Sequence, residues 1–143
     1  MTALDHGKIR TAMATQLAAV VLPSSNANLR ASRTPVRQVN CPQASVQDSQ
    51  GEFDGAMGRG LDQAFRYRVR VFAAPVENMD RGSDILDVLM KPDGPTSLRA
   101  ALASDTTFGG GCQTSRVESY QSHVIYDVAG QQYIGAELVI LVW

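Results

Sequence analysis

The sequence predicts an α+β fold in which a mainly antiparallel β-sheet packs against an N-terminal helix and a central helix pair. Three observations predict it: apolar residues recur every three or four positions over 6–21, they alternate with arginines over 65–71, and two β-rich runs joined by a short glycine turn end the chain. Because 143 residues is an ordinary domain size, we expect residues 1–143 to form a single domain.

The composition excludes several classes of protein. Lys and Arg number 13 against 14 Asp and Glu, a net charge of −1, whereas a dedicated nucleic-acid-binding protein has a strong basic excess. An apolar content of 44% argues against a disordered acidic chain. With no leader-like N-terminus, no apolar run of membrane-spanning length and only Cys41 and Cys112, we expect a cytosolic protein with reduced thiols.

The first element is an amphipathic helix predicted over residues 6–21. Its apolar residues fall on one helical face, Asp5 is a suitable N-cap, and Pro23 ends the pattern. The helix therefore needs a surface to pack against.

The next segment is predicted to be irregular and extended. Residues 23–34 are polar and loop-like, and an extended run begins at 35–39, is interrupted by Pro42 and resumes at 44–46. A proline in such a run indicates an edge strand or a bulge. A long Gly-rich loop is predicted at about 48–62.

The clearest strand starts at Phe65. Strict period-two alternation predicts a half-buried strand of an antiparallel sheet, with three arginines on its second face: Arg66, Arg68 and Arg70. Two interpretations stay open, a solvent-facing row or a row that meets an acidic partner or lines a lumen facing nucleic acid. Phe108 and Trp143 are further candidate interface residues, since aromatic side chains anchor interfaces as readily as they pack at edges.

Residues 80–103 predict two helical pieces, because Pro92 and Gly94 interrupt the apolar stripe. The glycines 109–111 follow a helix and lack the P-loop lysine, so we interpret them as a helix-to-strand joint. Strand candidates follow at about 112–119, 120–128 and 133–143. The last is apolar on both faces and is predicted to lie centrally in the sheet.

No catalytic constellation is recognisable. His6 and His123 lack metal-ligand spacing, and Asp84 and Asp87 are expected on a solvated helix face. Neither cysteine and no serine lies in a nucleophile motif. We therefore expect no metal site, no cofactor and no enzymatic activity.

The order of elements and the closing segment HVIYDVAGQQYIGAELVILVW, residues 123–143, resemble a known family. They are similar to the tail-terminator proteins of long, non-contractile-tailed phages (siphophages) and to related head-to-tail joining proteins. The resemblance covers roughly residues 6–143, and the loop at 48–62 departs from the compact family pattern.

The resemblance implies a virion structural protein without catalysis or cofactor. Such a protein forms a ring with copies of itself, in this family a homohexamer, which caps the tail tube, stops its polymerisation and provides the joint to the head and neck. Its partners would be the tail-tube protein and a head/neck connector protein. DNA would pass through the lumen without specific binding, and no membrane would be involved. The protein would reside in the virion and, during assembly, in the host cytoplasm.

Two alternatives remain open. One is another neck or head-completion connector protein of the virion. The other is a small soluble enzyme or ligand-binding domain whose pocket no motif reveals.

Overall fold

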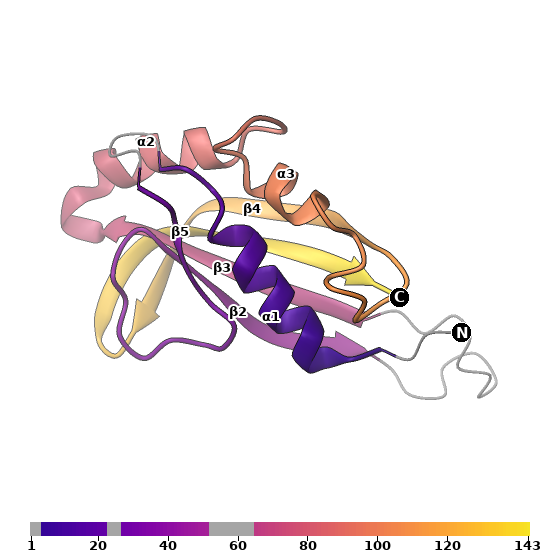
Figure 1. Cartoon of the computed structure of the whole chain (residues 1–143). Helices are drawn as coiled ribbons and strands as arrows, with labels where there is room; N and C mark the ends of the chain where they lie inside the picture. Colours follow the sequence, from indigo (N-terminus) through magenta and orange to yellow (C-terminus); the bar gives the residue numbers. More distant parts are fainter. Residues whose placement is uncertain (1–3, 23–26, 52–64) are drawn as a thin grey trace.

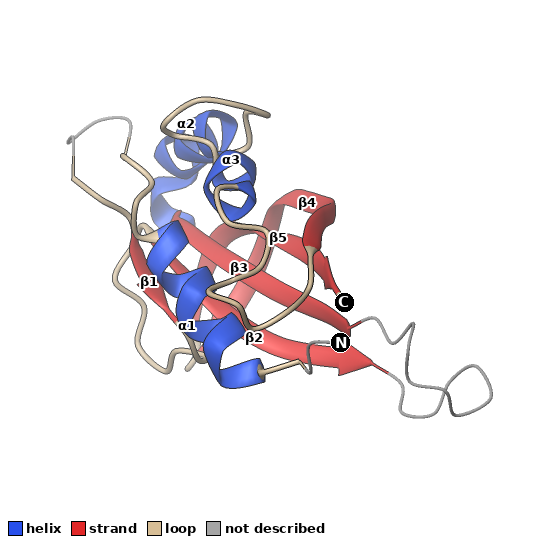
Figure 2. Cartoon of the chain, turned by 45° about the vertical axis from the view of Figure 1, so that its right-hand side comes forward, coloured by secondary structure: helices blue, strands red, loops and turns tan. Residues whose placement is uncertain are grey.

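A computed structural model describes residues 4–22, 27–51 and 65–143. Within them, five strands form one sheet in the order β1-β2-β3-β5-β4, and the helices cover one of its faces (Figures 1 and 2). The pair β1–β2 is parallel and the other pairs are antiparallel, so the predicted α+β fold is confirmed. The elements are α1 His6–Leu17, β1 Arg30–Ser32, β2 Gln43–Gly51, β3 Phe65–Pro75, the 3-10 turn η2 Val76–Asn78, α2 Met79–Leu89, α3 Leu98–Ala103, β4 Ser115–Val128 and β5 Gln131–Val142.

The core lies between the helices and one face of the sheet. β3 and β5 form its floor, because Tyr67 pairs with Ile140 and Val69 pairs with Leu138, and all four are buried. The helices supply the other side of the core with Ile9, Met13, Leu17, Ile85, Leu86, Leu89, Leu98 and Leu102. This confirms the strand that begins at Phe65 and its alternating pattern.

Helix α1 begins as predicted and ends earlier. The Asp5 side chain accepts a hydrogen bond from the Lys8 amide at 3.1 Å, as an N-cap does. The helix stops at Leu17 and not at residue 21. The cause is contact with segments outside the helix. The Val21 amide donates to the Pro95 carbonyl, and the Leu22 amide donates to the Ala27 carbonyl. The Ala19 and Val20 amides donate to carbonyls three residues back, so the helix tightens over its last turn before the chain leaves it at Val21.

The segment between α1 and β3 differs most from the prediction. The strand expected from residue 35 is wrong: residues 33–42 are irregular, and the chain instead pairs at 30–32, inside the predicted polar loop. The Ser32 hydroxyl bonds the Thr34 backbone, a local alternative to strand pairing. β2 continues to Gly51, into the predicted glycine-rich loop, and residues 52–62 of that loop lie outside the described residues.

The two-part helical region is confirmed as α2 and α3, the latter capped by Ser97. α2 packs close to the sheet at Gly82. A Cβ there would lie 2.4 Å from a methyl carbon of Ile134 and 3.1 Å from the Cβ of Ala74. Only glycine permits this approach without rearrangement.

The C-terminal region is one long hairpin. The predicted separate strands at 112–119 and 120–128 are one continuous strand, β4, whose pairing shifts at Glu118 and at His123. Each bulge moves the apolar alternation out of phase, which explains why the sequence pattern looked like two strands. The turn at Ala129–Gly130 is confirmed, and β5 lies centrally between β3 and β4 as expected.

Candidate interaction surface

The sheet face opposite the helices carries most of the predicted interface residues. Arg66, Leu141 and Arg116 form one row across β3, β5 and β4, because each is the register partner of the next. Side chains in such a row point to the same side of the sheet. We call this surface the arginine face, and it consists of Arg66, Arg68, Arg70, Arg116, Glu118, Glu137, Val139, Leu141 and Trp143.

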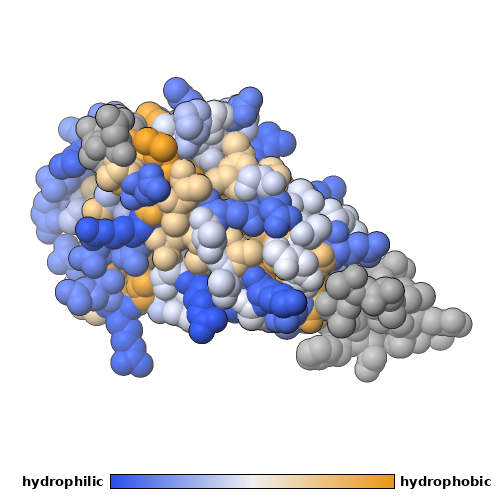
Figure 3. Space-filling model, viewed as in Figure 1, coloured by the Kyte–Doolittle hydropathy of each residue, from blue (hydrophilic) through white to orange (hydrophobic). Residues whose placement is uncertain are grey.

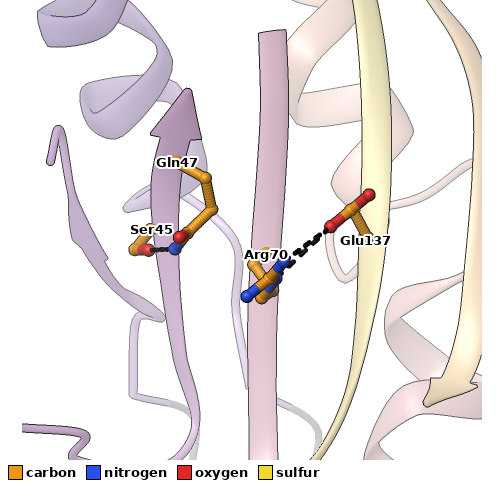
Figure 4. A network of polar contacts seen from close by, with 4 residues as sticks. All are labelled: Ser45, Gln47, Arg70 and Glu137. Carbon is orange, nitrogen blue, oxygen red and sulfur yellow. Dashed lines mark hydrogen bonds and ion pairs between the residues drawn. The ribbon is translucent and has the colours of Figure 1, made fainter. Parts of the chain in front are cut away.

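Arg70 is held in place by its neighbours. Its Nε and Nη2 atoms lie 3.3 Å and 3.2 Å from Oε2 of Glu137, its register partner on β5 (Figure 4). Its guanidinium carbon also lies 4.3 Å from the ring centre of Tyr126. Burial and the charge of Glu137 raise the pKa of Tyr126, which keeps that phenol neutral. Arg70 therefore stabilises the sheet, and its charge is compensated within the chain.

The other two arginines of β3 are exposed. Arg66 makes an ion pair with Glu118 at 3.0 Å, and this pair raises the pKa of Arg66. Arg68 makes no ion pair or side-chain hydrogen bond with any residue that the structure describes. The sequence suggested one uniform row of charges. The structure instead distinguishes three guanidiniums: that of Arg70 is compensated, that of Arg66 is loosely paired, and that of Arg68 has no partner among the described residues.

Trp143 joins the arginine face at the end of β5. The residue is 37% exposed, and the centre of its ring lies 6.0 Å from the guanidinium carbon of Arg116. The Trp143 backbone donates to the Thr114 carbonyl at 3.0 Å and accepts from the Gln113 amide at 2.8 Å. These bonds fix an exposed aromatic side chain beside arginines, the residue types that dominate binding hot spots.

Phe108 is not part of any exposed surface. It is fully buried in the core, so the prediction of an interface role for this residue is wrong. The turn around it explains why, because the Asp105 carboxylate accepts hydrogen bonds from the Thr107 and Gly109 amides, each at 3.0 Å. A hydrogen bond from the Thr107 hydroxyl at 2.7 Å, together with these two, lowers the pKa of Asp105. The three bonds hold the turn, in which Phe108 has a φ of 47° and points inward.

Sequence reasoning missed several members of the arginine face. Arg116 and Glu118 come from β4, and Glu137, Val139 and Leu141 come from β5. The alternation of β5 around Glu137 was the available signal, since a charged residue within an apolar strand marks the outward side. Which strand lies beside which arginine depends on sheet order, and one sequence does not reveal that order.

His123 binds side chains of α2 on the opposite side of the sheet. Its Nε2 atom lies 3.0 Å from the Ser83 hydroxyl and 3.5 Å from a carboxylate oxygen of Asp87, and its Nδ1 lies 2.7 Å from the Ser122 hydroxyl. The same three residue types form hydrolase triads, but here serine and aspartate share one ring nitrogen. The side chains of His123 and Asp87 are 40% and 67% exposed, so the cluster attaches a bulge of β4 to α2 at the surface.

A buried polar group lies under the start of α1. The Tyr67 hydroxyl bonds Nδ1 of His6, and burial raises the pKa of Tyr67 to about 12. The thiols of Cys41 and Cys112 are unpaired, and burial raises the pKa of each to about 11. A thiol with a raised pKa is a poor nucleophile at neutral pH.

An open groove of about 640 Å³ runs beside the exposed side of α1, lined among others by Lys8, Thr15, Arg33 and Asp105. Among the described residues, no group of three or more His, Cys, Asp or Glu side chains is placed to hold a metal ion. None of the helices in the described part is long and apolar enough to cross a membrane.

Comparisons with known proteins give no assignment. No protein-family model matches the chain, and no curated protein sequence matches it.

Proposed function

We propose that this chain is a virion structural protein that assembles with copies of itself into a ring, a hexamer in the family it resembles. The ring caps the tail tube, stops its polymerisation and provides the joint to the head and neck. Its partners are then the tail-tube protein and a head/neck connector protein, and DNA passes through the lumen without specific binding. The protein resides in the virion after assembly in the host cytoplasm.

The observation that carries the proposal is the one-sided construction of the fold. The helices cover one face of the sheet, and the other face presents Arg68, Leu141 and Trp143 without a covering layer among the described residues. A two-layer subunit of this kind has chemically different sides, which suits a ring component that contacts different neighbours on each side. The order of elements, with a long C-terminal hairpin, agrees with the layout of the family named above.

Removing the gene from the virus that encodes it tests the proposal. A tail terminator limits tube growth, so its loss is expected to give tails longer than the wild-type length, measured by electron microscopy. Tails of normal length that fail to join heads would assign the chain to the neck connectors instead. Normal, infectious particles would refute a structural role in the virion.

A further inference from the structure

We infer that the arginine face of one copy docks on an acidic ridge of helix α2 in a second copy. The acidic ridge consists of Asp80, Asp84 and Asp87, which follow one another at steps of four and three residues and so lie along one side of the helix. All three are exposed, while the opposite side of α2 is buried against the sheet. The inference rests on the proposed function, because it names the contact by which the ring would form.

The two surfaces carry opposite charge. The arginine face holds four guanidiniums and two carboxylates. The exposed stretch from η2 through α2 holds four carboxylates, Glu77 and the ridge, against the single guanidinium of Arg81. Hydrophilic side chains gather over the left end of the molecule in Figure 3, where Figure 1 places the start of α2. The net charge of −1 therefore conceals two surfaces of opposite net charge.

The charges that would meet are those with no ion-pair partner among the residues that the structure describes. Arg68, Asp80 and Asp84 each lack an ion pair with any other residue in the described ranges. Arg66 is tied to Glu118 only through an exposed pair, so it is free to exchange partners. Guanidinium and carboxylate groups that lose water together in an interface form short, directional pairs.

The spacing of the two rows matches. Alternate residues of a strand lie about 6.7 Å apart, which sets the distance from Arg66 to Arg68. Residues four apart on a helix are separated by about 6 Å along the axis, which sets the distance from Asp80 to Asp84. A helix laid along β3 therefore places two carboxylates opposite two guanidiniums in one register.

Apolar side chains flank both rows. Met79, 39% exposed, precedes the ridge, and Trp143, 37% exposed, adjoins the arginines. A thioether against an aromatic ring is a favourable contact and would exclude water from the ion pairs beside it. DNA phosphates would also attract Arg68, but they would leave the ridge and Met79 without a role. These apolar residues favour a second copy of the chain.

The contact joins two different surfaces that lie on opposite sides of one sheet. A row of subunits joined in this way therefore has a free arginine face at one end and a free acidic ridge at the other. Such a head-to-tail contact generates a ring when its rotation closes, which is the geometry that the proposed function requires.

Charge reversal tests the contact. Arg68→Glu and Asp84→Arg are each expected to raise the dissociation constant for self-association at least about tenfold, a factor that corresponds to about one lost interfacial ion pair. The combined variant R68E/D84R restores opposite charges across the contact and is expected to recover association to within about threefold of wild type. Arg37→Glu, an exposed position in the irregular segment 33–42, changes the net charge as Arg68→Glu does but lies outside both surfaces, so it serves as the matched control. Sedimentation velocity gives the constants, and salt on the order of 1 M should weaken the wild-type contact because it screens exposed charges.

Several results would overturn the inference. Equal effects of R68E and R37E, or a double variant that associates more weakly than both single variants, would exclude the proposed pairing. A wild-type chain that stays monomeric at about 1 mM would also exclude it. If R68E bound DNA more weakly than the wild type but self-associated equally well, the arginine face would be a nucleic-acid-binding surface instead. Tail length in the gene deletion does not depend on these results, so the proposed function can fail or stand separately.

Discussion

Arg66 and Arg70 lie four residues apart on one strand, yet the structure predicts different contributions to stability. Arg70→Ala removes two hydrogen bonds to Glu137 and the stacking on Tyr126. It also leaves Glu137, whose side chain is 18% exposed, without its partner. Arg66→Ala removes one ion pair that is 54% exposed on the arginine side. Both variants remove one positive charge, so a difference between their free energies of unfolding reports the effect of burial and not of charge.

The magnitude for Arg70 follows from its contacts. A hydrogen-bonded charged pair with limited exposure contributes about 1.5–2 kcal/mol, and a partly desolvated cation–π contact adds about 0.5–1 kcal/mol. We expect Arg70→Ala to lower the free energy of unfolding by about 2–3 kcal/mol, a decrease in Tm of roughly 5–10 °C. Arg66→Ala should behave like any other exposed substitution, because water and salt screen its ion pair.

Urea denaturation measures both effects, with circular dichroism and the fluorescence of the single tryptophan, Trp143, as independent probes. Adding Glu137→Gln to Arg70→Ala should recover part of the loss, since the partly buried side chain that has lost its partner is then neutral. Arg70→Lys should recover less, because an ammonium keeps the charge but lacks the planar stack. Equal losses for the Arg66 and Arg70 variants would refute the distinction.

Three further variants or conditions test the rest of the fold. Gly135→Ala would place a Cβ 2.0 Å from the Val71 carbonyl oxygen, so a loss of about 3 kcal/mol is expected in the same assay, and a neutral result would contradict the close approach of β3 and β5. Phe108→Ala should cost about 3–4 kcal/mol, whereas an exposed anchor would cost little. Stability should fall as the pH rises from about 9 toward 12. The reason is that folding raises the pKa of Cys112 from 9.0 to about 11 and that of Tyr67 from 10.0 to about 12, so the unfolded chain releases these protons first. Cys112→Ser should reduce the loss of stability in the lower part of this pH range. Urea titrations at several pH values measure it, and an unchanged decline in the variant would contradict the role of Cys112.

Local patterns predicted the elements whose burial is periodic. Three of these patterns are recognisable from a few neighbouring residues alone: the alternation from Phe65, the cap at Asp5 and the turn at Gly130. The structure confirms all three. The run predicted at 44–46 is confirmed as part of β2, but the segment at 30–39 was misplaced because β1 is a strand of three residues held by its neighbour β2, without an apolar pattern of its own. Pairing partners decide such a strand, and those partners are distant in the sequence.

The candidate site was predicted in part for the same reason. Alternation placed Arg66, Arg68 and Arg70 on one side of a strand, but it did not reveal that Glu137 compensates the third. Trp143 was expected at an edge or an interface and lies beside the arginines, while Phe108 was misassigned because a turn with positive φ buries it. Charge compensation and turn direction both depend on contacts between distant segments, which periodicity does not encode.

The sheet order sets the sequence in which this protein can fold. β4 and β5 are joined by a two-residue turn and can pair early. β3 pairs with a strand that is distant in the sequence, since Arg70 and its partner Glu137 are 67 positions apart. Closing a loop of that length costs entropy before any contact compensates for it, so we expect β3 to pair with β5 after the hairpin of β4 and β5 has formed. The arginine face contains residues of β3, β4 and β5, and it exists only after that step. Newly made chains therefore present this surface only once folded, which delays association until each subunit is complete.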